Sequence, residues 1–257
     1  MRDFPRDTWH LFVRLLRATA RMPIFVLISI VQPILWVLLF GQLFAKVTTI
    51  QGFGASSYVQ FLAPGISIMT ALFGAAYSGM GMLGDIDRGV LDRLLATPVS
   101  RGALIAARIL HSAFQVVIQA GIILAVACLL GARPHGGLSG VLTVFLAAGL
   151  LGAAFAAFSN ALALAARKQE LVIAMMNFVV LPSTFLSSMI MSRNLMPGWI
   201  RGVSRFNPVN WAVTAARDGF EGIAPGEVAL SLGLLAAFAL VCAALATRSF
   251  RRYRDSQ

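Results

Sequence analysis

Hydrophobic and charged positions alternate in long blocks along this chain of 257 residues. Six blocks contain no Asp, Glu, Lys or Arg and run for 20 to 29 residues each. Because about 20 apolar residues in a helix cross a hydrocarbon core of about 30 Å, each block is long enough to span a membrane. The pattern predicts an all-α, polytopic membrane protein with six transmembrane helices, at about 24–44, 61–83, 109–130, 138–166, 171–192 and 228–247.

The 21 basic and 10 acidic residues lie in the intervals between these blocks. With both termini in the cytoplasm, the cytoplasmic segments hold fifteen of the basic residues and the external segments six. This orientation is favoured, because cytoplasmic loops carry an excess of Lys and Arg. The net charge of +11 therefore reflects membrane topology, and we expect no nucleic acid partner.

Three segments outside the blocks are amphipathic. The first, 1–22, is predicted to be a helix lying in the cytoplasmic interface with Thr8 as its N-cap, the alternative being a solvated basic tail. The second, 84–101, predicts a short cytoplasmic helix over 85–96. The third, 195–226, predicts external re-entrant helices that dip into the outer leaflet and break at Asn207 and Pro208.

A polar stripe runs along the third predicted span. His111, Gln115 and Gln119 follow one another at a spacing of four residues, so they share one face of the helix. Such a stripe either forms hydrogen bonds between helices or lines a path for a polar substrate. The three histidines of the chain form no cluster along the sequence, and we expect no metal site.

Motifs for energy coupling and for catalysis are absent from the sequence. Neither of the two lysines follows a glycine-rich loop, so there is no nucleotide-binding P-loop, and HExxH, CxxC and GxSxG motifs are missing as well. No acid lies in the middle of a predicted span, whereas ion-coupled carriers commonly bury one there. We expect no catalytic residue and no cofactor bound by this chain. A membrane enzyme or assembly factor acting on lipid and an ion-coupled carrier remain as alternatives to a transport subunit.

Four local sequences, in order, resemble the type 2 ABC exporter permeases, and in particular their daunorubicin-resistance-like branch. The first is a Pro-containing opening of the first span, and the others begin the second span, form the following cytoplasmic loop and precede the last span. The family's acidic pair in the loop is rich in glutamate, whereas this chain has Asp85 and Asp87. The matching segments are 32–41, 58–65, 85–89 with 94–101, and 196–199 with 207–210.

The resemblance implies a single transmembrane domain over 1–257 in the bacterial inner membrane. It also implies a dimer, with a second copy or a paralogous permease, driven by two separate cytoplasmic ATPase subunits that bind ATP and Mg. The helix over 85–96 and the N-terminal helix would receive the ATPase stroke. The residues assigned to that coupling contact are Asp85, Asp87, Arg88, Leu91, Asp92, Arg93, Leu94 and Leu95.

For the substrate, the resemblance implies a path at the dimer interface between the second and fifth spans. Residue types suited to a bulky amphiphile occur in both spans, although ordinary helix packing explains each of them equally well. These candidates are Met69, Phe73, Tyr77, Met175, Met176, Asn177 and Phe185. We expect export of an amphipathic compound, such as a drug, an antibiotic, a lipid or a glycan.

Overall fold

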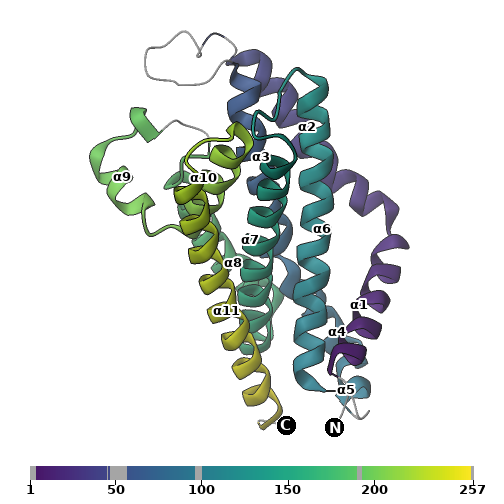
Figure 1. The fold of residues 1–257 in the computed structure, drawn as a ribbon. Coiled ribbons are helices and arrows are strands. Elements are labelled where there is room, and N and C mark those ends of the chain that lie inside the picture. The colour runs from purple at the N-terminus through teal and green to yellow at the C-terminus, as the bar shows by residue number, and fades with distance from the viewer. Residues whose placement is uncertain (1–3, 45, 47–56, 96–99, 190–192, 256–257) are drawn as a thin grey trace.

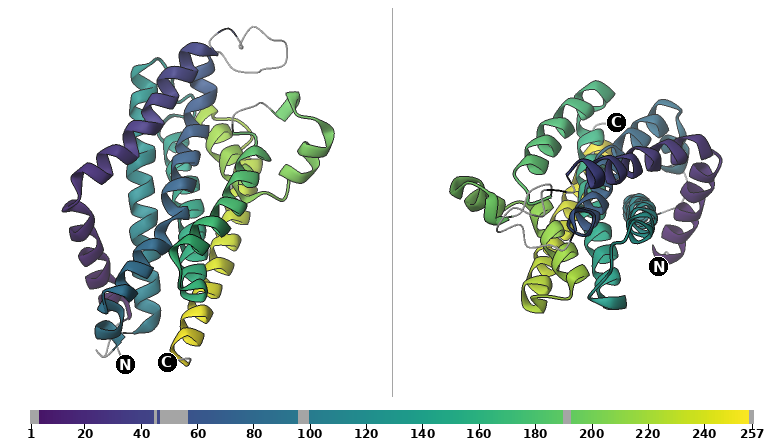
Figure 2. Two further views of the ribbon diagram at one scale, coloured as in Figure 1. Left: turned by 180° about the vertical axis from the view of Figure 1, so that it is seen from behind. Right: turned by 90° about the horizontal axis from the view of Figure 1, so that it is seen from above.

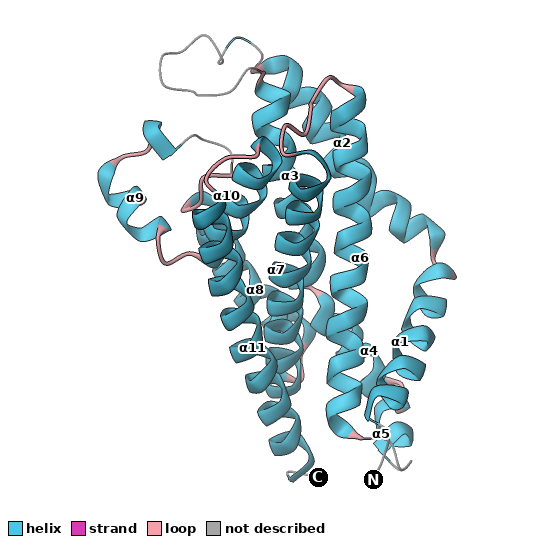
Figure 3. Cartoon of the chain, viewed as in Figure 1, coloured by secondary structure: helices cyan, strands magenta, loops and turns pink. Residues whose placement is uncertain are grey.

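The computed structural model describes residues 4–44, 46, 57–95, 100–189 and 193–255. Within these ranges every regular element is a helix (Figures 1 and 3). The helices are α1 (Phe4–Ala20), α2 (Pro23–Leu43), α3 (Tyr58–Ala76), α4 (Ser78–Asp87), α5 (Val90–Leu95), α6 (Arg101–Leu129), α7 (Gly137–Ala166), α8 (Gln169–Phe185), the 3-10 turn η2 (Arg193–Leu195), α9 (Gly198–Ser204), α10 (Pro208–Glu221) and α11 (Pro225–Asp255).

Each of the six predicted blocks falls on an apolar helix. Four helices are long and apolar enough to cross a membrane: Tyr58–Asp87, which joins α3 to α4, Gly102–Leu129, Gly137–Ala166 and Pro225–Phe250. Two shorter apolar helices, Leu27–Leu43 and Gln169–Phe185, overlap the first and fifth blocks. The prediction of an all-helical, multi-pass membrane protein is confirmed at this level.

Small residues let the central helices approach closely. α7 packs against α3, α6, α10 and α11 and is the centre of the bundle. Gly152 of α7 lies against Val116 of α6, and Gly79 of α4 lies against the backbone of Ser159 on α7. Such contacts matter in a membrane because lipid provides no hydrophobic drive for helices to associate. The helix formed by α3 and α4 is mostly interior, since 83% of its apolar window is buried.

The two termini lie at the same end of the bundle (Figure 1). α5 lies at that end as well, whereas the connection from α6 to α7 lies at the opposite end. α9 projects from the side of the bundle, away from the N-terminus, in the view from above (Figure 2). We call the end with the termini the terminal end and the opposite one the α9 end.

Several helix boundaries differ from the sequence prediction. α6 begins at Arg101 instead of 109, because the Ser100 hydroxyl caps it by accepting from the Ala103 amide (3.3 Å). α8 ends at Phe185 instead of 192. Thr8 is not the N-cap of α1, which already begins at Phe4; its hydroxyl donates to the Phe4 carbonyl instead (2.8 Å).

The predicted single helix over 85–96 is divided in two. Asp85 belongs to the last turn of α4, and α5 begins at Val90. Gly89 lies between them with a φ of +63°, a left-handed conformation that ends a helix and favours glycine. The prediction of one continuous helix was wrong because the glycine turns the chain.

The break predicted at Asn207 and Pro208 is confirmed. α10 begins at Pro208, where a proline loses no helical hydrogen bond, and the Asn207 side chain accepts from the Val209 amide (2.9 Å). The Asn207 amide group also donates to the carbonyls of Ser183 (2.7 Å) and Leu186 (3.1 Å). One side chain thus starts α10 and holds it against the end of α8.

Candidate functional site

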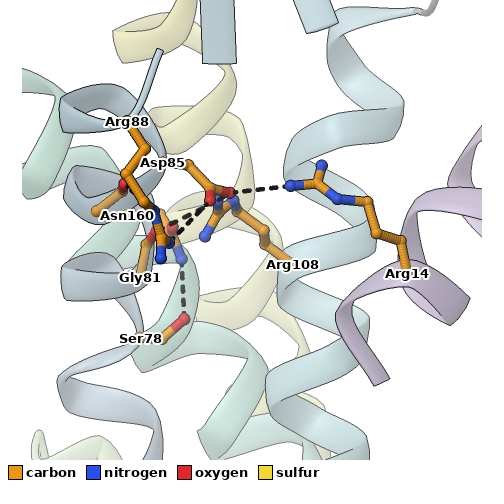
Figure 4. Close-up of polar contacts among 8 residues, drawn as sticks. Arg14, Ser78, Gly81, Asp85, Arg88, Arg108 and Asn160 are labelled. Carbon is orange, nitrogen blue, oxygen red and sulfur yellow. Dashed lines mark hydrogen bonds and ion pairs between the residues drawn. The ribbon is translucent and has the colours of Figure 1, made fainter. Parts of the chain in front are cut away.

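A buried carboxylate surrounded by arginines lies near the end of α4 (Figure 4). Asp85 of α4 forms an ion pair with Arg108 of α6, and both side chains are about nine-tenths buried. Arg14 of α1 lies 3.7 Å from the same carboxylate oxygen, and Arg88 donates to the other oxygen from one turn later (3.3 Å). We call these four residues the arginine cluster.

The arginine cluster holds three cations around one anion. Removing a charge from water is costly, and a buried charge is tolerated when it is paired and hydrogen-bonded. Asp85 satisfies that condition for Arg108, and Arg108 also approaches the Gly81 carbonyl (3.5 Å). The cluster connects α1, α4 and α6, and it keeps an excess of positive charge.

A cavity of about 500 Å³ begins at the arginine cluster. It lies between α1, α4 and α6, and its wall changes along its length from charged groups to neutral polar ones. His111, Ser112 and Gln115 of α6 continue the wall beyond Arg108. The remaining lining residues are Leu15, Ala18, Thr19, Gly74, Tyr77, Ser78, Met80 and Gly81.

A second cavity of about 340 Å³ adjoins the first. Gly74, Tyr77 and Gln115 line both, so the two hollows follow the same face of α6. The second wall is mainly apolar and is made by Pro33, Trp36, Met69 and Phe73, with Ser29, Gln32, Thr70 and Gln119 as its polar members. Together the cavities are charged at one end and apolar at the other, which is the distribution of an amphiphile.

The polar stripe of α6 forms hydrogen bonds between helices and also lines this path. His111 Nε2 is hydrogen-bonded to the Thr19 hydroxyl of α1 (2.9 Å), and the Gln119 amide group donates to the Ser29 hydroxyl of α2 (3.0 Å). His111 faces the first cavity, Gln119 the second and Gln115 both. The buried Gln119 Oε1 has no hydrogen-bond partner within the described part of the chain, and it is packed against Gly74 of α3.

Some of the predicted substrate-path residues line these cavities and others do not. Met69, Phe73 and Tyr77 line the cavities. The four on α8 do not: Met176 is buried, Asn177 accepts a hydrogen bond from the Tyr77 hydroxyl (2.5 Å), and Met175 and Phe185 are exposed on the outside of the bundle. Within one copy of the chain, α2 and α6 line the hollow together with α3, and the path at a dimer interface between the second and fifth spans stays a prediction.

The predicted coupling residues occupy three environments. Asp85 is buried in the arginine cluster and is not on an accessible surface. Leu91 is fully buried and Leu94 is half-buried, both packed inside this molecule. Asp87, Arg88 and Arg93 are exposed at the terminal end. The side chains of Asp92 and Leu95 lie outside the described set.

Sequence reasoning missed the roles of Arg14 and Arg108, which we had counted only as topogenic charges. A signal for Arg108 was present: it lies one turn before His111, so it extends the polar stripe toward the terminal end. No sequence signal connects Arg14 to Asp85, because they lie on separate helices far apart in the chain.

Arg217 was also missed, and it organises the α9 end. Its guanidinium donates to the carbonyls of Ser188 (2.9 Å) and Met189 (3.2 Å) and stacks 3.8 Å from the centre of the Phe61 ring. One arginine of α10 thereby binds the segment after α8 and the start of α3. Nearby, Glu221 accepts from Gln60 (2.8 Å) and pairs with His135 (2.8 Å), which adds the turn before α7.

The structure is a bundle of apolar helices with two adjoining cavities that are charged at one end and mainly apolar at the other. The chain belongs to the ABC-2 type transporter family, whose model matches residues 6–220. It is similar to the daunorubicin resistance ABC transporter permease protein DrrB1 of Streptomyces coeruleorubidus, with 29% identity over 94% of this chain and 84% of that protein. It is also similar to the putative transport permease ycf38 of Cyanophora paradoxa (30% identity; 83% and 74%) and to the inner membrane transport permease YadH of Escherichia coli K12 (25%; 93% and 91%).

Family membership confirms the resemblance found in the sequence. The chain is a transmembrane subunit of an ABC transporter and not an enzyme. Permeases of this class work together with an ATPase and with a second permease.

Proposed function

We propose that this chain is the permease of an ATP-driven exporter that moves an amphipathic compound out of the cytoplasm. It spans the bacterial inner membrane six times, with both termini and the terminal end of the bundle in the cytoplasm. It dimerises with a second copy or a paralogue. Two cytoplasmic ATPase subunits bind ATP and Mg and supply the energy, which agrees with the absence of a P-loop from this sequence.

The pair of cavities is the observation that carries this proposal. Charged and polar groups line the end nearest the cytoplasm, and Trp36, Met69 and Phe73 line the end deeper in the membrane. Ligand sites are commonly hollows of about 300–1,000 Å³ with mostly apolar walls and a few polar groups, and both cavities fall within that range. An amphiphile entering from the cytoplasmic leaflet would find matching chemistry along α6.

The surface of α9 supports the proposal that the segment before the last span is re-entrant. Trp199, at the start of this helix, is 67% exposed, and Phe206, two residues after its end, is 82% exposed. Tryptophan is enriched at membrane interfaces because its ring is both apolar and polar. We place α9 and α10 in the outer leaflet, where α10 packs on α7 and α11.

Reconstitution tests this function. The permease is inserted into liposomes together with its partner ABC ATPase, and movement of fluorescent amphiphiles is followed with and without ATP. The proposal expects ATP-dependent transport that stops when the Walker lysine of the ATPase is replaced by alanine. Transport by the permease alone, driven by an ion gradient, would instead identify a carrier. Chemical conversion of an added lipid would identify a membrane enzyme.

A further inference from the structure

The chemical class of the transported compound follows from the charges that line its path. The first cavity contains Arg14, Arg88 and Arg108 but a single acid, Asp85, so the described lining carries two positive charges in excess. The second cavity has no charged residue in its lining. A positive region at one end of an apolar hollow selects for the opposite charge on the ligand that enters it.

We propose that the site takes an amphiphile with an anionic head, such as a phosphate or phosphonate ester with an aliphatic tail. This inference deepens the proposed function, because it names the substrate class of the same cavity. The head would lie against Arg14 and Arg88, and the tail would extend past Tyr77 toward Trp36 and Met69.

Each arginine of the cluster has a different capacity to bind such a head. Arg108 is committed to Asp85, since both are buried and in contact. Arg14 and Arg88 are 42% and 68% exposed, and their distances to the shared carboxylate, 3.7 and 3.3 Å, are longer than those of a strong charged hydrogen bond. A guanidinium has five donors in a planar fork, so both side chains keep donors for a phosphate while they face Asp85.

Asp85 reduces the positive charge of this site but does not cancel it. One carboxylate compensates the buried Arg108, which would otherwise be left as an isolated charge. The two outer arginines then stay positive and line the cavity, so they attract an anion that enters it. The same field repels a cationic head, so the cavity discriminates by charge.

The neutral polar groups beyond the cluster fit the linkage between head and tail. Gln115 lines both cavities, at the change from charged to apolar wall. Farther along, Gln119 presents a buried acceptor that has no partner among the described residues.

The test uses one labelled probe and four unlabelled competitors, three of which share its dodecyl chain. The purified full-length permease is placed in phosphatidylcholine nanodiscs, and binding of fluorescently labelled dodecyl phosphate is measured. Unlabelled dodecyl phosphate, dodecyltrimethylammonium, dodecyl maltoside and inorganic phosphate are the competitors. We expect dodecyl phosphate to compete at least about tenfold better than the two other dodecyl compounds, because a charged hydrogen bond is worth about 1.5–3 kcal/mol. Inorganic phosphate, which lacks a tail, should compete weakly.

Substitutions assign the binding to this cavity. Arg14→Gln and Arg88→Gln should each weaken dodecyl phosphate about tenfold, by the same energy per contact. Arg17→Gln is the matched control, since it removes the same charge from the same helix at an exposed position that lines neither cavity. Equal affinity for the anionic and cationic probes, or equal loss with Arg17→Gln and Arg14→Gln, would overturn the proposal.

Two further measurements complete the test. One identifies the source of the anionic ligand, and the other distinguishes a failure of this inference from a failure of the exporter function. Displacement of the probe by phosphatidylglycerol in the nanodisc would identify a lipid headgroup as the anion, and no displacement would identify an amphiphile from the cytoplasm. If inorganic phosphate competes as well as dodecyl phosphate, the amphiphile is excluded. Binding with the expected charge preference but no ATP-driven transport would contradict only the exporter function. Transport of cationic and anionic amphiphiles alike would contradict only this inference.

Discussion

Arg108 of α6 and Asp85 of α4 form an ion pair in which each side chain is about nine-tenths buried. The pair lies where α1, α4 and α6 meet, and Arg14 and Arg88 approach the same carboxylate. A charge pair in this position is both a structural contact and the electrostatic centre of the cavity. Several predictions of different kinds depend on it and on the other polar contacts of the bundle.

Replacing Asp85 with Asn should destabilise the protein strongly. The variant leaves Arg108 buried without its counter-charge, and removal of one partner of a buried pair costs about 3–5 kcal/mol. Thermal unfolding of the purified protein in detergent measures the loss. Asp87→Asn is the control, because Asp87 lies on the same helix and is exposed. The double variant Asp85→Leu/Arg108→Met should be more stable than Asp85→Asn, and a double variant that is less stable would contradict the pairing.

Gly79→Ala should disrupt the contact between α4 and α7. A methyl group there would overlap the Ser159 backbone, and overpacking of this kind costs about 1–3 kcal/mol. Gly81→Ala, on the same helix, meets its nearest atom at 3.6 Å and should be neutral or slightly stabilising. The unfolding temperatures of the two variants test this prediction. Equal values would contradict a destabilising overlap at Gly79.

Arg217→Lys should loosen the α9 end although the positive charge remains. A lysine ammonium cannot reproduce the two separate carbonyl contacts and the planar stacking on Phe61, so we expect a loss of about 2–3 kcal/mol. Hydrogen exchange at the start of α10 and after α8 should increase. Arg205→Lys, an exposed change before α10, provides the comparison, and similar exchange in both variants would contradict the role of Arg217.

Asp218 should make stability depend on pH. Burial raises the pKa of its carboxyl from 3.8 to about 6; the neighbouring Arg217 opposes this effect and Glu227 adds to it. The folded state then binds the proton more tightly than the unfolded state, so stability should fall as the pH rises from about 4 to about 6. Asp218→Asn should remove this slope and raise stability at pH 7. Unfolding temperatures between pH 4 and pH 7.5 test it, and an unchanged slope in the variant would assign the dependence to another group.

Exposed charges near α5 should be needed for coupling to the ATPase but not for folding. Asp87→Ala together with Arg93→Ala removes two charges that the described structure leaves accessible at the terminal end. We expect at least a tenfold reduction in ATP-driven transport, the size of effect given by about 1.4 kcal/mol, with unchanged unfolding temperature. Lys168→Ala with Glu170→Ala, at the N-cap and in the first turn of α8, is the control. Equal losses in both double variants would contradict a contact localised at α5.

Much of the fold could be predicted because the hydrocarbon of a membrane restricts which backbone structures can form within it. Backbone polar groups in hydrocarbon must be satisfied within the chain, so an uncharged block of 20 or more residues predicts a helix without knowledge of its neighbours. The break before α10 was predictable for a local reason as well, since proline suits the first turn of a helix and asparagine suits its cap. The turn at Gly89 was missed because charged and apolar residues on both sides of it continue the same helical pattern.

The site could be predicted only in part. His111, Gln115 and Gln119 share a face by helix geometry, so the stripe was visible, but its neighbours α1, α2 and α3 were not. The resemblance implied a path at a dimer interface between the second and fifth spans, and it did not indicate the hollow that α2 and α6 form with α3 within one copy of the chain. The pairing of Asp85 with Arg108 was hidden for the same reason, because sequence spacing does not report which helices are adjacent.

The sequence by itself determined that this chain is a helical membrane protein, since the number and length of its uncharged blocks need no tertiary contact, and four local segments indicated its family. The tertiary structure decided which polar groups meet. It buried Asp85 among three arginines, turned the stripe of α6 into the wall of a cavity and gave Arg217 its carbonyl partners. The physical reason is that hydrophobicity acts on each helix separately, whereas charge pairing and cavity shape depend on the packing between helices.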